Sequence, residues 1–324
     1  MKRGASWLGI GAGLGMLVLI LDSKTAMAGA SQGVELCIRT VIPALFPLML
    51  LSNQLMDGLR GTSSNWLRPI GQLFSMPEGM EGLLIPAFLG GYPVGAQCIG
   101  AEYRNGNLSK ETAEKLLAYC SNAGPSFLFG MAGSLFSIST NAWKLWGIQI
   151  LSALLVSKIV SASEGICDRS SIYVSGSSIA TSVKVMGCIC GWVVLFRVWI
   201  AFLDRWFLWL LPSTARIIVV GALELSNGCN ALFQILQEPI RFVLCSGMLS
   251  FGGICVLLQT KSVINGLSIR PYLLGKLMQT GFSVALAIGC LWNIWITSGI
   301  TVGIFLLMGG KIRKSSRNPL TLGV

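Results

Sequence analysis

The sequence contains no histidine and few charged residues. Charged side chains make up 11% of its 324 residues, against about 25% of a typical soluble domain. Without histidine, a Ser-His catalytic pair and an imidazole-bound zinc site are both impossible. A Ser-Lys pair is compatible with the composition, but no motif positions one. We therefore expect that the protein is not an enzyme and that it has no metal site and no cofactor.

Two further motifs are missing from the sequence. The ten cysteines include no C-x-x-C pair, which argues against a zinc site and a disulfide framework. The G-x-x-x-x-G-K-[ST] loop of nucleotide-hydrolysing proteins is also missing, so any driving force would come from a gradient or from a partner.

Hydrophobic residues, by contrast, form 53% of the chain and recur in long runs from end to end. This pattern predicts an all-α polytopic membrane protein with about eight transmembrane helices plus re-entrant hairpins. The net charge is +11, but the basic residues lie mostly in short connections and at the ends. That distribution is typical of the positive-inside bias rather than of nucleic-acid binding, and it predicts that both termini are cytoplasmic.

The segment 83–133 is apolar enough for a membrane but is interrupted twice by helix-breaking residues. The first interruption is Gly-Gly-Tyr-Pro-Val-Gly at 90–95, and the second is Ser-Asn-Ala-Gly-Pro-Ser at 121–126. Lipid cannot satisfy the backbone groups that such breaks free, so they must face protein or a wet cavity. One interpretation is a transporter site built from a hairpin and a broken helix. The other is two kinked helices packed through small residues.

The second half of the chain contains similar interruptions of apolar segments. Two apolar arms, 217–223 and 231–236, flank a polar tip at 224–230, and Ser-Phe-Gly-Gly follows at 250–253. We predict two repeats, with inverted topology as a hypothesis. The expected organisation is an N-terminal membrane half at 1–160, a linker at 161–182, a C-terminal membrane half at 183–310 and a basic cytoplasmic tail at 311–324.

Residues 1–30 allow two interpretations. They resemble a secretory signal peptide, with an A-x-A sequence at 26–28, or they form a retained first span, which we favour. Further along, Pro43 and Pro47 are expected to kink one helix twice. Arg197, within an apolar run, should face protein rather than lipid.

The interruptions supply the candidate substrate-binding residues, either as closely approachable backbone or as polar side chains. Glu224 stands out among them because an ionised carboxylate at bilayer depth is costly. It should be paired, protonated or beside a wet cavity, where it could carry a coupling proton or hold a cation; alternatively, it lies at the membrane surface. The full set is Gly90, Gly91, Tyr92, Pro93, Gly95, Ser121, Asn122, Gly124, Glu224, Ser226, Asn227, Ser250, Gly252 and Gly253.

Several of these motifs, in this order, resemble the YlbJ/SpoVV sporulation membrane protein family. They are V-I-P-A-L-F-P at 41–47, G-G-Y-P-V-G-A at 90–96, C-S-N-A-G-P-S-F at 120–127, L-E-L-S-N-G at 223–228, and S-F-G-G at 250–253 with Gln259. The resemblance spans residues 28 to 291. The family belongs to a wider nucleoside-recognition, or Gate, group. Ser226 departs mildly from it, since many relatives have threonine there.

The resemblance implies a fold like that of concentrative nucleoside transporters, and dipicolinate transport into the developing spore across the outer forespore membrane. From the residues themselves, we expect a multi-pass secondary transporter of a small anionic or heteroaromatic solute. The expected partners are that solute, membrane lipid, a coupling ion such as H⁺ or Na⁺, and a second copy of the chain. The alternatives are a nucleoside or nucleobase transporter and a sporulation scaffold that transports nothing.

Overall fold

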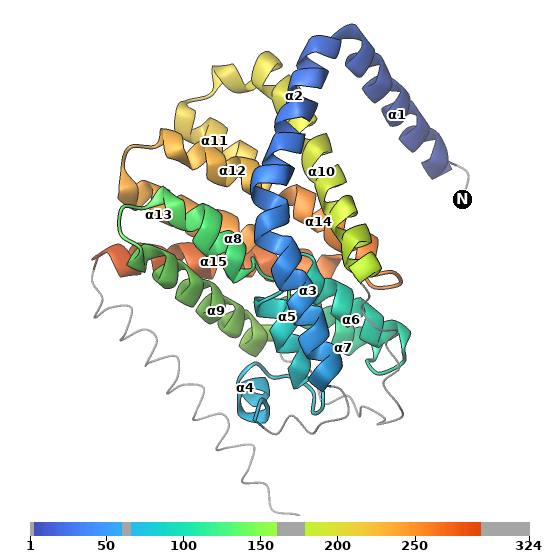
Figure 1. Ribbon diagram of the computed structural model, residues 1–324, viewed down its shortest axis with the longest axis vertical. Coiled ribbons are helices and arrows are strands. Elements are labelled where there is room, and N and C mark those ends of the chain that lie inside the picture. The colour runs from blue at the N-terminus through green and yellow to red at the C-terminus, as the bar shows by residue number, and fades with distance from the viewer. Residues whose placement is uncertain (1–2, 60–65, 161–178, 293–324) are drawn as a thin grey trace, which may run out of the picture.

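The computed structural model describes residues 3–59, 66–160 and 179–292. The predicted tail at 311–324, the end of the last apolar run (293–308) and most of the predicted linker lie outside these residues. Every regular element in the described ranges is helical (Figure 1). Five stretches there are long and apolar enough to cross a membrane, which confirms a helical membrane protein. They are Ser23–Ser52, Thr140–Val160, Ser182–Trp206, Glu238–Val263 and Arg270–Trp292. The full number of about eight spans stays a prediction.

The chain begins with a helix that leaves the body of the molecule and continues into a long helical rod (Figure 1). Asp22 ends the first helix and caps the second, since its carboxylate accepts a hydrogen bond from the Thr25 backbone N–H at 3.4 Å. The rod then widens into a π-helical turn just ahead of Pro43, as a proline-induced distortion predicts. The elements are α1 (Arg3–Leu21), α2 (Ser23–Leu36), the π turn (Cys37–Val41) and α3 (Ile42–Leu59), with Pro47 inside α3.

The first predicted interruption, at 90–95, occurs and turns the chain back on itself. Two helices, α5 (Leu84–Phe88) and α6 (Val94–Arg104), pack against each other across a non-helical tip. Ser109 then caps α7 by accepting a hydrogen bond from the Thr112 N–H at 3.1 Å. The second predicted break also occurs, because the chain is not helical between residues 120 and 124. The other helices here are α4 (Arg68–Leu73), α7 (Lys110–Leu117), α8 (Pro125–Phe127) and α9 (Thr140–Val160), with short π and 3₁₀ turns before α9.

The second half contains the same two devices. Glu224 alone separates two packed helices, so the expected tip at 224–230 and second arm at 231–236 are wrong: with the Glu224 side chain capping it, the polar segment 225–231 is itself the second helix. Glycines at 252 and 253, with φ of +80° and +87°, interrupt the next long helix. Gly281, a possible further break to judge from the sequence alone, lies inside an unbroken helix, since a lone glycine costs a helix only about 1 kcal/mol. The helices are α10 (Ile179–Trp206), α11 (Ser213–Leu223), α12 (Leu225–Ala231), α13 (Glu238–Phe251), α14 (Gly253–Val263) and α15 (Arg270–Trp292).

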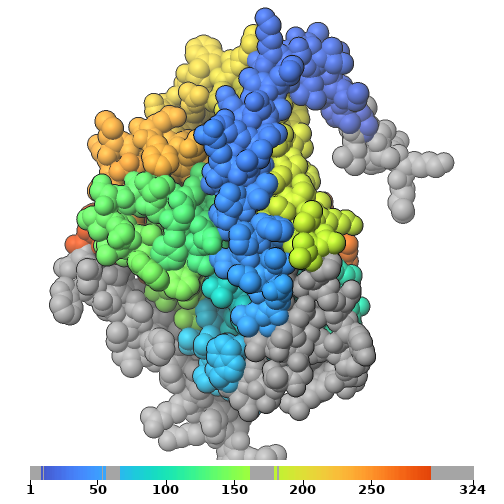
Figure 2. All heavy atoms as spheres, viewed as in Figure 1, coloured from blue at the N-terminus to red at the C-terminus, as the bar shows by residue number. Residues whose placement is uncertain are grey.

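Helix α10 lies side by side with α2, and together they bring the two halves into contact (Figure 1). A β-carbon on Gly29 would lie 3.0 Å from the Val198 backbone, and one on Gly33 would lie 2.9 Å from the Val194 backbone. These glycines therefore let the two helices approach closely, as small residues do in membrane helix pairs. The α2–α3 rod crosses the face drawn in Figure 2, between the segments coloured green and yellow-green.

Candidate functional site

Three of the four predicted interruptions line one small cavity, and the fourth, at 250–253, packs against Tyr92 and Glu224 in its lining. Its volume is about 30 Å³, which is room for about one water molecule. The first hairpin tip contributes Tyr92, the first helix break contributes Gly124, and the second hairpin tip contributes Glu224 and Ser226. Gln259, from the helix after the second break, completes the polar part of the lining. We call this small cavity the constriction.

In the first half, the hairpin tip and the helix break touch through glycine. Gly91 has φ +78°, and a β-carbon there would lie 3.2 Å from the Gly124 nitrogen. A β-carbon on Gly124 would lie 3.1 Å from the Gly91 α-carbon. The contact at Gly95 is tighter still, because a β-carbon added there would lie 2.1 Å from the Cys120 carbonyl oxygen. The backbones therefore meet without side chains between them, which only glycine permits.

The second half repeats this contact with different residues. A β-carbon on Gly253 would lie 3.2 Å from the carbonyl oxygens of Gly221 and Leu223, and 3.3 Å from the Glu224 nitrogen. Thus the broken helix again packs backbone to backbone against the tip of its own hairpin. Gly228 and Gly221 bring the two arms of that hairpin together.

Tyr92 links the first hairpin to the second break. Its hydroxyl lies 3.1 Å from the Leu249 carbonyl oxygen and 3.2 Å from that of Ser250, and donates to these acceptors. Its ring lies against Gly252, where a β-carbon would be 3.2 Å from the nearest ring carbon. One side chain therefore holds the first tip against the end of α13.

Glu224 is buried at the tip of the second hairpin, and only 2% of its surface is exposed. Its side chain is therefore enclosed by protein and does not lie on the surface of the described structure. Its carboxylate accepts hydrogen bonds from the N–H groups of Ser226 at 3.0 Å and Asn227 at 2.7 Å, and from the Asn227 side-chain amide at 2.6 Å. A buried carboxylate needs such donors, so Glu224 fixes the start of α12.

A lysine that the sequence analysis missed lies at the centre of a buried polar cluster. Lys276, on α15, has no exposed surface. Its ammonium nitrogen lies 2.7 Å from the Gln279 side-chain oxygen, 3.2 Å from the Tyr92 hydroxyl and 3.3 Å from the Asn122 side-chain oxygen. The signal was present, since a lysine inside an apolar run is by default a functional residue.

A much larger cavity, of about 450 Å³, lies on one side of the constriction. We call it the arginine cavity, because Arg39, Arg197 and Arg216 line it. Arg39 pairs with Glu35 at 3.2 Å, and Arg216 pairs with Asp204 at 2.9 Å. Arg197 instead donates to the Gln32 side-chain oxygen, which confirms that it faces protein. The remaining polar lining consists of Thr40, Asn227, Asn230 and Gln234.

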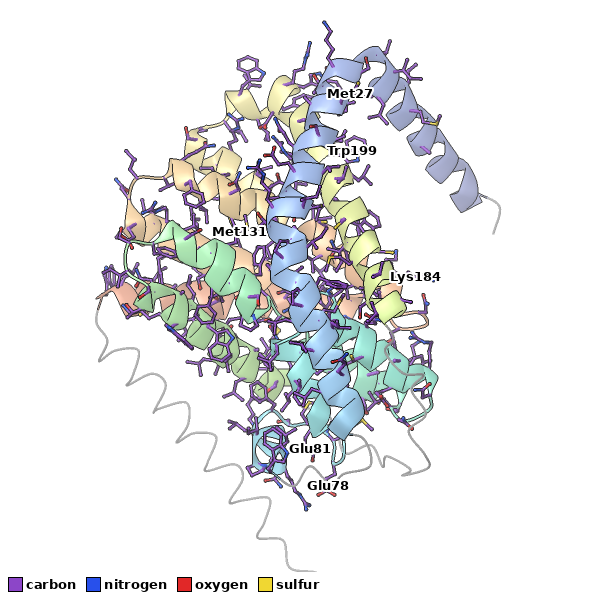
Figure 3. All side chains as sticks on the ribbon, viewed as in Figure 1. Met27, Glu78, Glu81, Met131, Lys184 and Trp199 are labelled. Carbon is purple, nitrogen blue, oxygen red and sulfur yellow. The ribbon has the colours of Figure 1, made fainter. Side chains whose placement is uncertain are left out.

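A third cavity, of about 300 Å³, lies on the other side and is less polar. Pro93, Gln97, Lys184, Trp192 and Gln259 are among the residues that line it. We call it the Lys184 cavity; Figure 3 labels Lys184 at one end of α10 and Trp199 farther along the same helix.

The three cavities follow α10 in order. Residues 184–192 border the Lys184 cavity, residues 189 and 193 border the constriction, and residues 197–204 border the arginine cavity. At a rise of about 1.5 Å per residue, residues 184 and 204 are roughly 30 Å apart along the helix. That distance is close to the thickness of a bilayer's hydrocarbon core.

The sequence-predicted site residues thus fall into three groups. Some line a cavity: Tyr92, Gly124, Glu224 and Ser226 at the constriction, Asn227 in the arginine cavity and Pro93 in the Lys184 cavity. Some allow close backbone contact: Gly90, Gly91, Gly95, Gly252 and Gly253. The others are buried beside the breaks: Ser121, Asn122 and Ser250.

Comparisons with known proteins found no matching family model, no matching curated protein and no matching solved structure.

Proposed function

We propose that this protein is a secondary transporter of a small anionic solute. The supporting observation is the arrangement along α10, where two cavities of about 450 and 300 Å³ are separated by a constriction of about 30 Å³. Three of the four helix interruptions line that constriction, and the fourth packs against Tyr92 and Glu224. A pathway blocked in its middle by movable, non-helical backbone is what alternating access requires.

The arginine cavity favours an anion. Two of its arginines are neutralised by carboxylates, whereas Arg197 has a neutral glutamine as its partner. A guanidinium with a neutral partner can bind a carboxylate or phosphate through two parallel hydrogen bonds. We propose Arg197 as the residue that first binds the solute.

The two matching hairpin-and-break units support the proposed repeat architecture. In each half, the tip of the hairpin packs on the broken helix through glycine. We propose that the repeats are inverted and that one hairpin swings to open each cavity in turn. The resemblance then suggests dipicolinate as the solute and the outer forespore membrane as the location.

A nucleoside or nucleobase is the second candidate solute. The side chains of Asn227, Asn230 and Gln234 line the arginine cavity with neutral donors and acceptors, which suit the hydroxyls and base edges of such a solute.

The test is uptake into liposomes that contain the purified protein, with dipicolinate and uridine as separate substrates. We expect uptake and counterflow of dipicolinate. We also expect Arg197→Gln to raise its KM roughly tenfold or more, because a hydrogen bond between charged groups contributes about 1.5–3 kcal/mol.

Arg270→Gln is the matched control, since Arg270 is exposed and lines none of the three cavities. Uridine uptake that is unaffected by Arg197→Gln would instead favour the nucleoside candidate. Absence of flux for both solutes, with binding to other sporulation membrane proteins, would favour the scaffold.

A further inference from the structure

Lys276 is surrounded by neutral groups. Its three hydrogen-bonding neighbours are two side-chain amides and a phenol, and the rings of Tyr92 and Tyr272 lie 5.0 and 5.9 Å from its nitrogen. No carboxylate in the described part of the chain lies within 4 Å of it, the limit for an ion pair. Buried ammonium groups are normally paired, because removing the charge from water is expensive.

Helices α9 and α13, which pack against α15, place no carboxylate beside Lys276, since Glu238 at the start of α13 accepts a hydrogen bond from the Asn141 amide at 3.1 Å instead. Helix α9 presents Gln149, whose backbone carbonyl accepts from Gln279, and α13 presents Ser246, which bonds Ser283. The titratable groups that face Lys276 are Tyr92, Tyr272 and the Cys120 thiol.

The carboxylates of α7 are occupied elsewhere. Glu111 pairs with Lys115 at 2.7 Å, and Glu114 accepts the Ser268 N–H at 2.8 Å. Glu224 is held by its own hairpin, as described above.

The position of Lys276 ties it to the moving parts of the proposed cycle. Tyr92 belongs to the first hairpin tip, so its contact with Lys276 must change when that hairpin opens. Asn122, in the first break, contacts both Lys276 and the Ala87 carbonyl of that hairpin. Opening would expose the lysine to water, where an amine takes up a proton. Closing without solute would return it to dry, neutral surroundings, which disfavour the charged form, whereas a bound anionic solute would supply the missing counter-charge and let the protonated lysine pass through the closed state.

We propose that Lys276 is the proton-binding site that couples transport to a proton gradient. The amine lone pair takes a proton from the water of the open cavity when the anionic solute binds, and the ammonium releases that proton to water with the solute when the opposite cavity opens; the empty site returns with a neutral amine. This inference rests on the proposed transport function. It assigns the coupling ion as H⁺ rather than Na⁺, and assigns its binding to Lys276 rather than Glu224.

The first test compares driving forces in proteoliposomes. We expect wild-type protein to accumulate dipicolinate under an inwardly directed proton gradient, and to be indifferent to a sodium gradient. We expect Lys276→Gln, which retains hydrogen-bonding capacity without a titratable group, to keep counterflow but lose proton-driven accumulation. Lys144→Gln is the matched control, since Lys144 lies on α9 and is exposed.

A second readout does not depend on accumulation. When dipicolinate is added to detergent-purified protein in weak buffer, a pH indicator should report a proton change of about one per chain. The change should disappear in Lys276→Gln and persist in Glu224→Gln. If Lys276→Gln does not insert into the membrane, Lys276→Met takes its place. The wild-type comparison of proton and sodium gradients tests the identity of the coupling ion without any variant.

The outcomes separate the two proposals. Flux driven by sodium, or proton-driven accumulation by Lys276→Gln, overturns the coupling role and leaves the transport function standing. Absence of flux by wild-type protein for every solute tested overturns both.

Discussion

The two hairpins are alike in backbone but are held in different ways. The tip of the second hairpin is fixed from within, because Glu224 bonds the N–H groups of its own α12. The tip of the first hairpin has no charged side chain, and Tyr92 fixes it through contacts with Leu249, Ser250 and Lys276 in the other half. The second tip can therefore move as a unit, whereas any movement of the first tip breaks contacts between the halves.

The largest expected effect is at the glycine contact of the first hairpin. Gly91→Leu should abolish transport, because its φ of +78° disfavours any side chain and a β-carbon would be 3.2 Å from both Gly124 and the Leu45 side chain. Flux in proteoliposomes and the yield of folded protein are the two measurements.

Gly147→Leu is the control for this change, since Gly147 is an exposed residue of α9 with open space around it. Loss of folded protein would mean that the contact serves packing alone. Normal flux would show that the tip is neither a close contact nor a gate.

Gly253→Ala tests the matching contact of the second half and should have a smaller effect. The φ of +87° and the neighbouring carbonyl oxygens at 3.2 Å predict a loss of at least about 1–2 kcal/mol in the free energy of unfolding. Gly281→Ala, in the unbroken part of α15, should leave stability unchanged or raise it by up to about 1 kcal/mol. Thermal unfolding of both variants checks the difference. Equal shifts in their melting temperatures would contradict the argument that rests on backbone geometry.

Glu224→Gln should reduce accumulation and counterflow by the same factor. A glutamine retains one oxygen acceptor, but its NH₂ group would face one of the two backbone N–H donors, at a cost of about 1–3 kcal/mol. The tip of α12 would then be less ordered in every transport mode. Loss of accumulation with intact counterflow would instead assign the coupling proton to Glu224, and would contradict the role proposed for Lys276.

The sequence predicted those features that depend on local backbone chemistry. The glycine and proline breaks at 90–95, 121–126 and 252–253 follow from which residues accept unusual φ or lack an N–H. Gly281 shows the limit of that reasoning, since a single glycine does not decide whether a helix continues.

The features that depend on long-range packing were not predictable. Lys276 lies 184 residues from Tyr92 in sequence, and no periodicity brings them together. The three arginines of the large cavity come from α2 and its π turn, from α10 and from α11. Only the tertiary fold makes them one site, although each was visible as a charged residue near an apolar run.

The smallest expected effect comes from Tyr92→Phe, which keeps the ring against Gly252 and removes only the hydroxyl. Each lost hydrogen bond is worth about 0.5–1.5 kcal/mol. The contact between the halves, and therefore the closed state, should be destabilised by about 1 kcal/mol, raising the open population roughly fivefold. Tyr119→Phe is the control, because the Tyr119 hydroxyl contacts Met76 within the first half, at 3.5 Å. If the first hairpin is the gate, Tyr92→Phe should speed passive solute leak while Tyr119→Phe should not, even where both lower the melting temperature equally. Equal leak in the two variants would mean that the cross-half contact stabilises the fold without controlling the pathway.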